Sequence, residues 1–161
     1  MTLLRQPDIG YIPTPHNVTR SLLDFAKVTS SDILYDLGSG DGRILIEAAQ
    51  RWGTRGVGID IDPKRIQQAQ ENTQTAGVSD LIEFRQEDLF KSDFHQATVV
   101  FIYLLPHLNL RLRSRLKRQL QPGSRIISKD FDLGDWPPLH TLFLPAKTED
   151  DEEVTLYYWR V

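Results

Sequence analysis

The heptapeptide Asp36-Leu37-Gly38-Ser39-Gly40-Asp41-Gly42 lies between an apolar run, residues 33–37, and a segment with apolar residues at helical spacing, residues 43–52. Glycine adopts positive φ without strain, and its missing Cβ lets a ligand reach the backbone. The helix that follows presents free N–H groups and the positive end of its dipole to the loop. This order of elements predicts a ligand-binding loop with Asp36, Gly38, Ser39, Gly40 and Gly42 as contacts. The alternative is a tight glycine turn that binds nothing.

Strands and helices alternate outward from this loop. The pattern predicts strands at 33–37, 56–60, 81–85, 97–104 and 125–129, and helices that begin at Thr14-Pro15 and at 43, 63 and 108. Two further strands, 139–144 and 154–159, follow without a helix between them. This order favours an α/β, Rossmann-like, mostly parallel sheet covered by helices on both faces, with a C-terminal antiparallel hairpin. No repeat or linker interrupts the chain, so we expect one domain over 1–161, with 1–13 as a lead-in segment.

The composition narrows the possible functions. The 161 residues include no cysteine, which excludes disulfides, thiol catalysis and cysteine-ligated metal. No apolar run approaches the ~20 residues that cross a bilayer, and the first ten residues contain no apolar stretch of signal-peptide length. The net charge of −3 gives the molecule as a whole no attraction to nucleic acid. We therefore expect a cytoplasmic protein without a membrane segment and without a metal site.

The spacing of the glycines indicates the kind of ligand. A dinucleotide loop reads G-x-G-x-x-G and receives a pyrophosphate. Here the spacing is G-x-G-x-G, and Asp36 stands in front of it. A carboxylate at this place repels a phosphate and suits an ammonium group. The loop therefore favours S-adenosylmethionine, which carries an amino acid group and an adenosine but no pyrophosphate.

Two more carboxylates follow the next two strands. Asp60 ends the second strand, where a carboxylate accepts hydrogen bonds from both ribose hydroxyls of a nucleoside. Its alternative role is a negative charge at the helix that begins at Pro63, although Asp62 already fills the N-cap position there. Asp88 follows the third strand and suits an adenine amino group, unless it belongs to an ordinary polar loop. Open α/β sheets bind ligands at this edge, so the three acids together predict one site.

These residues carry a family resemblance. The heptapeptide resembles the first motif of class I, seven-stranded S-adenosylmethionine-dependent methyltransferases. Gly58-Ile59-Asp60 is similar to the second motif and Gln86-Glu87-Asp88-Leu89 to the third. The resemblance covers most of the chain. It implies methyl transfer with S-adenosylmethionine as cofactor, and it implies that Ile61 and Leu89 contact the cofactor beside Asp60 and Asp88.

A narrower resemblance rests on fewer residues, namely Tyr11-Ile12-Pro13-Thr14-Pro15, the heptapeptide with Arg43, and Asp135-Trp136-Pro137-Pro138. They are similar to the lysine N-methyltransferases of the mitochondrial adenine nucleotide translocase and of the ATP synthase c-subunit, and to their prokaryotic relatives. This resemblance implies that Tyr11 and Thr14 lie beside the cofactor and that a protein lysine is the acceptor. Mitochondrial members carry a hydrophobic segment before the domain. Since this chain begins close to Tyr11, we expect no membrane attachment.

The acceptor is expected beyond the fourth strand. Methyl transfer from a sulfonium is a direct displacement, so the enzyme mainly aligns an acceptor that has a lone pair. Tyr103 and Asp130, at the ends of the fourth and fifth strands, are the candidate catalytic residues. The alternative for Tyr103 is a core aromatic at the end of a buried strand. Residues 103–107 lack the Asn-Pro-Pro-Tyr type motif of adenine amino-methyltransferases, which disfavours a nucleic acid base as acceptor.

Charge indicates the class of partner. An acidic rim is predicted if the sixth strand runs parallel to the others; its members are Asp130, Asp132, Asp135 and the hairpin turn 149–153. Such a rim attracts a cationic protein segment, although a solvated turn is the alternative. The basic residues of helix 108–120, Arg111, Arg113, Arg115, Lys117 and Arg118, are interpreted as a solvated face and not as a nucleic-acid patch. No stable nucleic-acid binding is expected.

The sequence therefore predicts a methyltransferase that acts on a lysine of a protein. Three alternatives remain open: a nucleic acid base as acceptor, a small amine as acceptor, and a catalytically inactive module that binds S-adenosylmethionine. The oligomeric state is not determined by the sequence.

Overall fold

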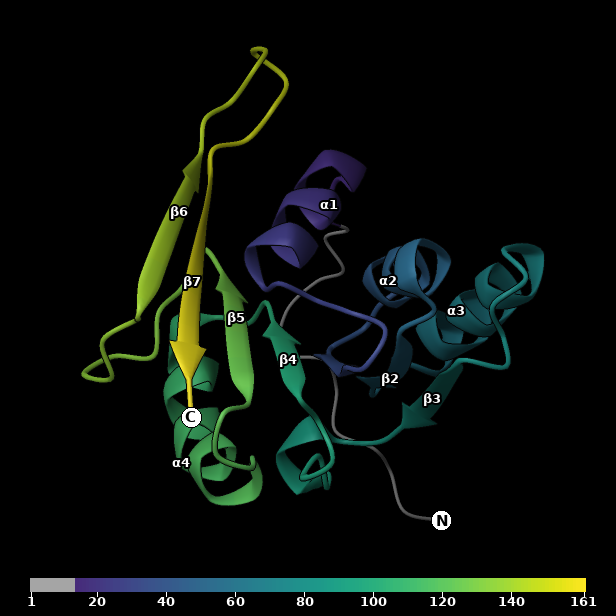
Figure 1. The fold of residues 1–161 in the computed structure, drawn as a ribbon, viewed down its shortest axis with the longest axis horizontal. Coiled ribbons are helices and arrows are strands. Elements are labelled where there is room, and N and C mark those ends of the chain that lie inside the picture. The colour runs from purple at the N-terminus through teal and green to yellow at the C-terminus, as the bar shows by residue number, and fades with distance from the viewer. Residues whose placement is uncertain (1–13) are drawn as a thin grey trace.

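The computed structural model describes residues 14–161 and contains a seven-stranded sheet in the order β3-β2-β1-β4-β5-β7-β6 (Figure 1). Its strands are β1 (Ile33–Leu37), β2 (Arg55–Asp60), β3 (Ile82–Gln86), β4 (Val99–Ile102), β5 (Arg125–Lys129), β6 (His140–Leu144) and β7 (Val154–Arg160). The first five strands are parallel, and β7 is antiparallel to both β5 and β6. The predicted Rossmann-like sheet with a terminal antiparallel hairpin is confirmed.

Helices cover both faces of the sheet. They are α1 (His16–Phe25), α2 (Arg43–Trp52), α3 (Pro63–Thr75) and α4 (Pro106–Gln119), with a short 3₁₀ turn η1 (Leu89–Lys91). One apolar core unites α1 and α2 with one face of the strands, and α3 contacts β2 and β3. On the other face α4 and η1 form a second core, in which Leu108, Leu112 and Leu116 are buried. All four residues of β4 are buried, as expected for a strand covered on both faces.

Local signals explain most helix ends. Asp62 is the N-cap of α3, where its side chain accepts a hydrogen bond from the Lys64 N–H (2.9 Å), and Pro63 is the first helical residue. The helix α2 ends at Gly53, whose left-handed φ of 71° closes the last turn.

Most predicted strand ends agree within one residue, and the differences with a structural reason lie at the start of α1 and around β4 and α4. Thr14 is not a helix cap, because the N-cap of α1 is Pro15 and no side chain caps this helix. The fourth strand is shorter than residues 97–104, because it pairs with β1 and β5 only from Val99 to Ile102. The helix α4 begins at Pro106, in the first helical position that proline favours, and not at Leu108.

The direction of β6 places the hairpin turn. Because β6 and β5 are both antiparallel to β7, β6 runs in the same direction as the parallel strands. The turn between β6 and β7 therefore lies at the edge where the carboxyl ends of the parallel strands meet, here called the carboxyl edge. In Figure 1 this turn extends beyond the carboxyl ends of β4 and β5. The acidic turn 149–153 therefore lies at the ligand-binding edge, as the predicted acidic rim requires.

Candidate active site at the carboxyl edge

The glycine loop turns sharply where β1 meets α2. Gly38, Gly40 and Gly42 have φ of 95°, 57° and 82°, a region that side chains rarely adopt. The loop is tied to the neighbouring strand, since the N–H groups of Gly38 and Ser39 both donate to the carbonyl of Ile59 (2.7 and 3.1 Å). These bonds fix the shape of the loop next to the end of β2.

Gly58 of β2 and Gly42 leave room beneath the loop for the Phe84 ring. A Cβ on Gly58 would lie 2.7 Å from both Phe84 and the Ser39 hydroxyl, and one on Gly42 would lie 3.0 Å from Phe84. The Ser39 hydroxyl oxygen is buried and has no hydrogen-bond partner. The sequence motif Gly58-Ile59-Asp60 therefore has a steric reason, because only glycine lets Phe84 and the loop pack this closely.

Asp36 is the most perturbed carboxyl group of the site. It lies near the end of β1 and is 3% exposed, and its carboxylate accepts no hydrogen bond from residues 14–161. Burial, together with the charges of Asp60 and Asp41, raises its pKa to about 8. A buried carboxyl without a donor beside a glycine loop fits the ammonium of an amino acid, which supplies both hydrogen bonds and a positive charge. The residues present therefore fit S-adenosylmethionine.

The Asp60 side chain binds the backbone of the glycine loop and the backbone of the turn before α3. Its carboxylate accepts hydrogen bonds from the N–H groups of Gly40 (3.0 Å) and Asp62 (2.9 Å). Burial raises the pKa of Asp60, and these two hydrogen bonds oppose the rise. The half-buried Ile61 follows in the turn before α3. Asp60 thus fastens the glycine loop at the place where the sequence predicts ribose binding.

Asp88 has a structural role in addition to its predicted one. Its side chain caps η1 by accepting a hydrogen bond from the Phe90 N–H (2.9 Å). Leu89, the next residue, is buried against the core beneath. Adenine contact by Asp88 and Leu89 stays a prediction, on a loop that the cap holds at the end of β3.

The entry to α1 is fastened to the glycine loop. Arg43 forms an ion pair with Asp41 (2.6 Å) and donates a hydrogen bond to the carbonyl of the buried Thr14 (2.8 Å). Thr14 therefore lies next to the loop that the sequence predicts as the cofactor contact. Tyr11, the other predicted contact from this segment, lies outside the described residues.

Tyr103 and Asp130 come together with a residue that the sequence analysis missed. Lys129, the last residue of β5, is 1% exposed; its ammonium nitrogen lies 4.0 Å from the centre of the Tyr103 ring and 3.8 Å from Asp130 Oδ2. The Tyr103 ring also stacks on Phe131, with ring centres 6.3 Å apart. Burial raises the pKa of Tyr103, and the negative charges of Asp130 and Glu152 add to the rise. Lysine is seldom fully buried, and an apolar strand gives no sequence signal for it.

The other acids of the predicted rim are only partly free. Asp135 forms an ion pair with Arg113, and Asp132 accepts a hydrogen bond from the Gly134 N–H (3.0 Å). The residues of the turn, 149–153, are exposed. Asp130 therefore lies beside Tyr103 at the predicted acceptor side, Asp132 and Asp135 have local partners, and the turn is the solvated part of the rim.

Basic residues of α4 contact the loop that follows β3, so they are more than a solvated face. Arg115 Nη2 donates to the carbonyl of Ser92 (2.9 Å), and Gln119 donates to the same carbonyl (3.0 Å). The Arg111 guanidinium lies 4.2 Å from the centre of the Phe90 ring. These three residues recur every four positions along one side of α4 and hold the loop that carries Asp88.

A neighbouring row on α4 holds the loop after β5 in the same way. Asn109 Nδ2 donates to the carbonyls of Phe131 (3.2 Å) and Asp132 (3.1 Å). Arg113 donates to the carbonyl of Leu133 (3.1 Å), and the Lys117 ammonium lies 4.6 Å from the centre of the Trp136 ring. The charged groups of Arg113 and Lys117, like those of Arg111 and Arg115, therefore have partners within the protein.

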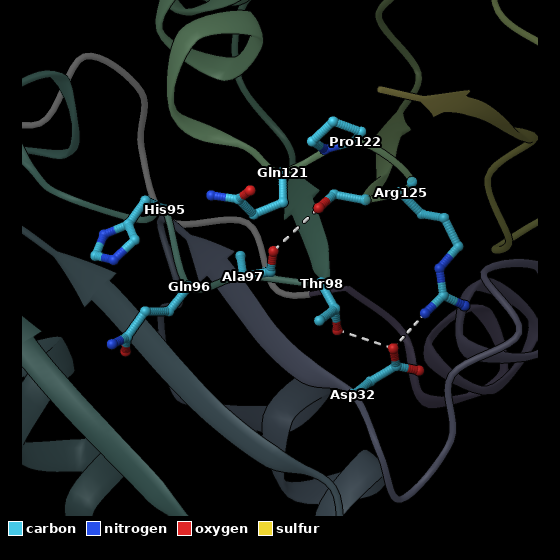
Figure 2. Close-up of a pocket in the computed structure, with 10 residues that line it drawn as sticks. Asp32, His95, Gln96, Ala97, Thr98, Gln121, Pro122 and Arg125 are labelled. Carbon is cyan, nitrogen blue, oxygen red and sulfur yellow. Dashed lines mark hydrogen bonds and ion pairs between the residues drawn. The ribbon is translucent and has the colours of Figure 1, made fainter.

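One pocket lies at the opposite, amino-terminal edge of the sheet (Figure 2), among residues that precede β4 and β5. Asp32 accepts a hydrogen bond from the Thr98 hydroxyl (2.8 Å) and forms an ion pair with Arg125. These bonds join the starts of three strands. The candidate cofactor and acceptor residues do not line this pocket, so we regard it as a structural junction.

Comparison with known proteins identifies the family. The ANTKMT methyltransferase domain matches residues 36–140. The chain is 39% identical to a protein-lysine N-methyltransferase of Saccharolobus islandicus (strain REY15A), over 89% of this chain and 88% of that protein. It is 31% identical to the adenine nucleotide translocase lysine N-methyltransferase of Mus musculus over 66% of this chain, but it spans 46% of that protein's length.

A solved structure is still more similar in sequence. An RNA methyltransferase from Salinibacter ruber, in complex with S-adenosyl-L-homocysteine, is 50% identical with a TM-score of 0.86, and the match covers 92% of this chain and 93% of that one. The family match includes the glycine loop, Asp60, Asp88 and the predicted acceptor residues Tyr103 and Asp130. The chain therefore belongs to the ANTKMT methyltransferase family and is a class I S-adenosylmethionine-dependent methyltransferase.

Proposed function

We propose that the acceptor of this methyltransferase is the side chain of a lysine in a protein. The observation that carries the proposal is the pair of rings and the carboxylate at the ends of β4 and β5, where Tyr103, Phe131 and Asp130 lie together. Phe131 and the Lys129 ammonium cover the faces of the Tyr103 ring, so the groups left for the alkylammonium of a substrate are the Tyr103 hydroxyl and the Asp130 carboxylate, a hydrogen-bonding group and a negative charge. The protein-lysine N-methyltransferase of Saccharolobus islandicus supports the same acceptor class.

The residues of this chain have separate tasks in the transfer. Bound S-adenosylmethionine supplies a methyl group on a positively charged sulfur. Asp36 would receive the amino group of the cofactor, Asp60 its ribose hydroxyls, and Asp88 with Leu89 its adenine, while Thr14 and Ile61 would border it and Tyr11 is a further predicted contact. The backbone of the glycine loop, from Gly38 to Gly42, would receive its carboxylate.

Tyr103 and Asp130 act on the acceptor. Asp130 attracts the lysine ammonium to the site and orients its nitrogen. Because its pKa is raised, the Tyr103 hydroxyl stays protonated at neutral pH and serves as a hydrogen-bonding group, not as a base. The proton of the ammonium leaves to water, since a displacement on an activated methyl group needs an aligned lone pair more than a dedicated base.

An RNA acceptor is the second candidate, because the similar protein from Salinibacter ruber is an RNA methyltransferase. Two features of this chain count against it. Arg111 and Arg115 contact the loop after β3, and the turn 149–153 places five acidic residues at the edge where the acceptor enters. Phosphates would be repelled there, whereas a cationic protein segment would be attracted.

The remaining proposals concern the setting of the enzyme. No helix within residues 14–161 has the length and apolar character needed to cross a membrane. We place the enzyme in the cytoplasm as a single domain over 1–161, where the absence of cysteine fits a reducing compartment.

The acceptor class is tested by labelling a cell lysate with radioactive S-adenosylmethionine in the presence of the protein. The expected label survives nuclease, is lost to protease, and is recovered as methyl-lysine after acid hydrolysis. The matched control is Asp36→Asn, which should label nothing. Label that is lost to ribonuclease and survives protease would replace the lysine proposal with the RNA candidate.

A further inference from the structure

Lys129 occupies a position that the fold reserves for apolar side chains. It ends β5 after the buried residues Ile126 and Ile127, it is paired with the buried Leu156 of β7, and only 1% of it is exposed. Removing an ammonium from water is costly unless the protein supplies partners for it. An apolar residue would therefore serve the core at least as well, and the reason for a lysine must lie in what the ammonium contacts.

The ammonium contacts the two residues predicted to act on the acceptor. It lies against the face of the Tyr103 ring, 4.0 Å from the ring centre, and 3.8 Å from Asp130 Oδ2. Within the described part of the chain these are its charged and aromatic partners. Tyr103 follows β4 and Asp130 follows β5, so one buried cation connects the ends of two neighbouring strands at the carboxyl edge.

Each partner is held from another direction as well. Asp130 has a φ of 66°, a left-handed conformation that is uncommon outside glycine, and its Oδ1 accepts a hydrogen bond from the Thr155 N–H of β7 (3.1 Å). The Tyr103 ring lies at 12° to the Phe131 ring, with which it stacks. The Asp130 carboxylate is therefore held by β7, and the Tyr103 ring is held by Phe131. The Lys129 ammonium supplies the contact that they share.

We propose that Lys129 is a positioning residue of the acceptor site, which fixes the Tyr103 ring and the Asp130 carboxylate relative to each other. The proposal rests on the proposed function for the identity of the acceptor, but the arrangement of the three side chains does not depend on that identity. Methyl transfer is sensitive to alignment, since a misplacement of about 1 Å costs up to about 100-fold in rate. Lys129 acts in this way without touching either substrate.

The test compares Lys129→Met with Lys117→Met in the full-length protein. Both lysines lie over an aromatic ring, but Lys117 faces Trp136, which packs on Trp159 near the start of β5 and far from the carboxyl edge. We expect Lys129→Met to fold and to bind S-adenosylhomocysteine as well as the wild type by calorimetry, while kcat falls about 10- to 100-fold. Lys117→Met should keep the wild-type kcat.

A second readout needs no acceptor. In protein with labelled tyrosines, the ring resonance that Tyr103→Phe removes identifies Tyr103. This resonance should shift in Lys129→Met and stay in place in Lys117→Met, because the cation against the ring is lost only in the first. The shift is expected even if the acceptor turns out to be RNA, so failure of the proposed function and failure of this proposal are distinguishable.

Two results would overturn the proposal. One is a folded Lys129→Met with an unchanged kcat or an unchanged Tyr103 resonance. The other is a loss of kcat accompanied by an equal loss of S-adenosylhomocysteine affinity and of melting temperature, which indicates a core role only. Should Lys129→Met not fold, Lys129→Arg is compared in the wild-type and Tyr103→Leu backgrounds. A smaller loss of kcat in the second background supports the link, and equal losses refute it.

Discussion

The most buried acidic residue has different surroundings in the two halves of the carboxyl edge. On the cofactor half, at the ends of β1 to β3, Asp36 is buried, forms no ion pair within residues 14–161, and has its pKa raised to about 8. On the acceptor half, Asp130 has Lys129 beside it and Asp135 has Arg113. If Asp36 receives the ammonium of the cofactor, as we propose, its cation comes with the ligand. On the acceptor half, the protein supplies the cation and keeps the carboxylate in place before a substrate arrives.

The halves also differ in what gives them their shape. Glycines and backbone hydrogen bonds shape the cofactor half, as in the bonds from Gly38 and Ser39 to Ile59. Side chains from distant segments shape the acceptor half, through α4, β7 and the Lys129 contacts. Substitutions in the first half should therefore affect cofactor affinity, whereas substitutions in the second should affect turnover and the choice of acceptor.

The largest effect is expected for Asp36→Asn. The cofactor ammonium loses a charged hydrogen-bond acceptor in a buried place, so the affinity for S-adenosylhomocysteine should fall by about 3 kcal/mol, which is about 100-fold. Calorimetric titration of both proteins measures the loss. An affinity within a factor of about two of the wild type would show that Asp36 does not bind the cofactor.

The free Asp36→Asn protein should also differ in its response to pH. The pKa of Asp36 rises from its ordinary value of 3.8 to about 8 on folding, so the folded state favours the protonated carboxyl. Its contribution to stability is full below pH 3.8 and is lost as the pH rises through about 8. Melting curves of the wild type should fall over this range relative to those of Asp36→Asn. Parallel curves would contradict the shift.

The next largest effect is expected for Asp60→Ala. Loss of the acceptor for the ribose hydroxyls should weaken cofactor binding by ~1–3 kcal/mol. Because the carboxylate also accepts hydrogen bonds from the N–H groups of Gly40 and Asp62, the free protein should lose about 1 kcal/mol of stability as well. Titration and melting of the same variant separate the two losses. Normal cofactor affinity with a large drop in melting temperature would make Asp60 a purely structural residue.

The contrast between the two halves also explains which features could be predicted from the sequence. The cofactor half follows from local signals, because glycine spacing and acids at strand ends are read from consecutive residues. The mostly parallel sheet and its terminal hairpin also followed, from the alternation of strands and helices and from the missing helix between the last two strands. Thr14 was misread as a cap, since a threonine before a proline has the same local pattern whether it starts a helix or packs beside a loop.

The acceptor half could not be derived in the same way. Lys129 looks like the polar end of a strand, and its burial depends on Leu156 and Tyr103, 27 and 26 residues away in the sequence. The arginines of α4 look like a solvated face, whereas their partners lie in two loops whose positions the sheet order sets. Contacts between distant segments have no periodicity that a single sequence displays.

A smaller effect that sharpens the comparison is proton release on cofactor binding. At pH 7 Asp36 is mostly protonated in the free protein, because its pKa is about 8. An ammonium bound beside it favours the carboxylate, so binding should release close to one proton and affinity should rise with pH up to about 8. Titrations in buffers with different ionisation enthalpies count the proton, and Asp36→Asn is the control that should release none. Equal heats of binding in all buffers would show that the wild type releases no proton, and would contradict the binding of the ammonium beside Asp36.

The smallest effect is expected on the acceptor half, where charge is exposed to water. Replacing the five acids at 149–153 by amides should raise the KM for a protein substrate about two- to fivefold and leave kcat unchanged, because exposed charges govern encounter more than chemistry. The same rise in KM should appear in the wild type as salt rises, since screening at physiological ionic strength acts over ~8 Å.

The matched variant, Arg111→Gln with Arg115→Gln, should lower the melting temperature through the loop after β3 and leave the salt dependence of KM intact. If the arginine variant instead loses transfer to RNA and the amide variant loses nothing, the carboxyl edge receives a polyanion, and the rim does not recruit the acceptor.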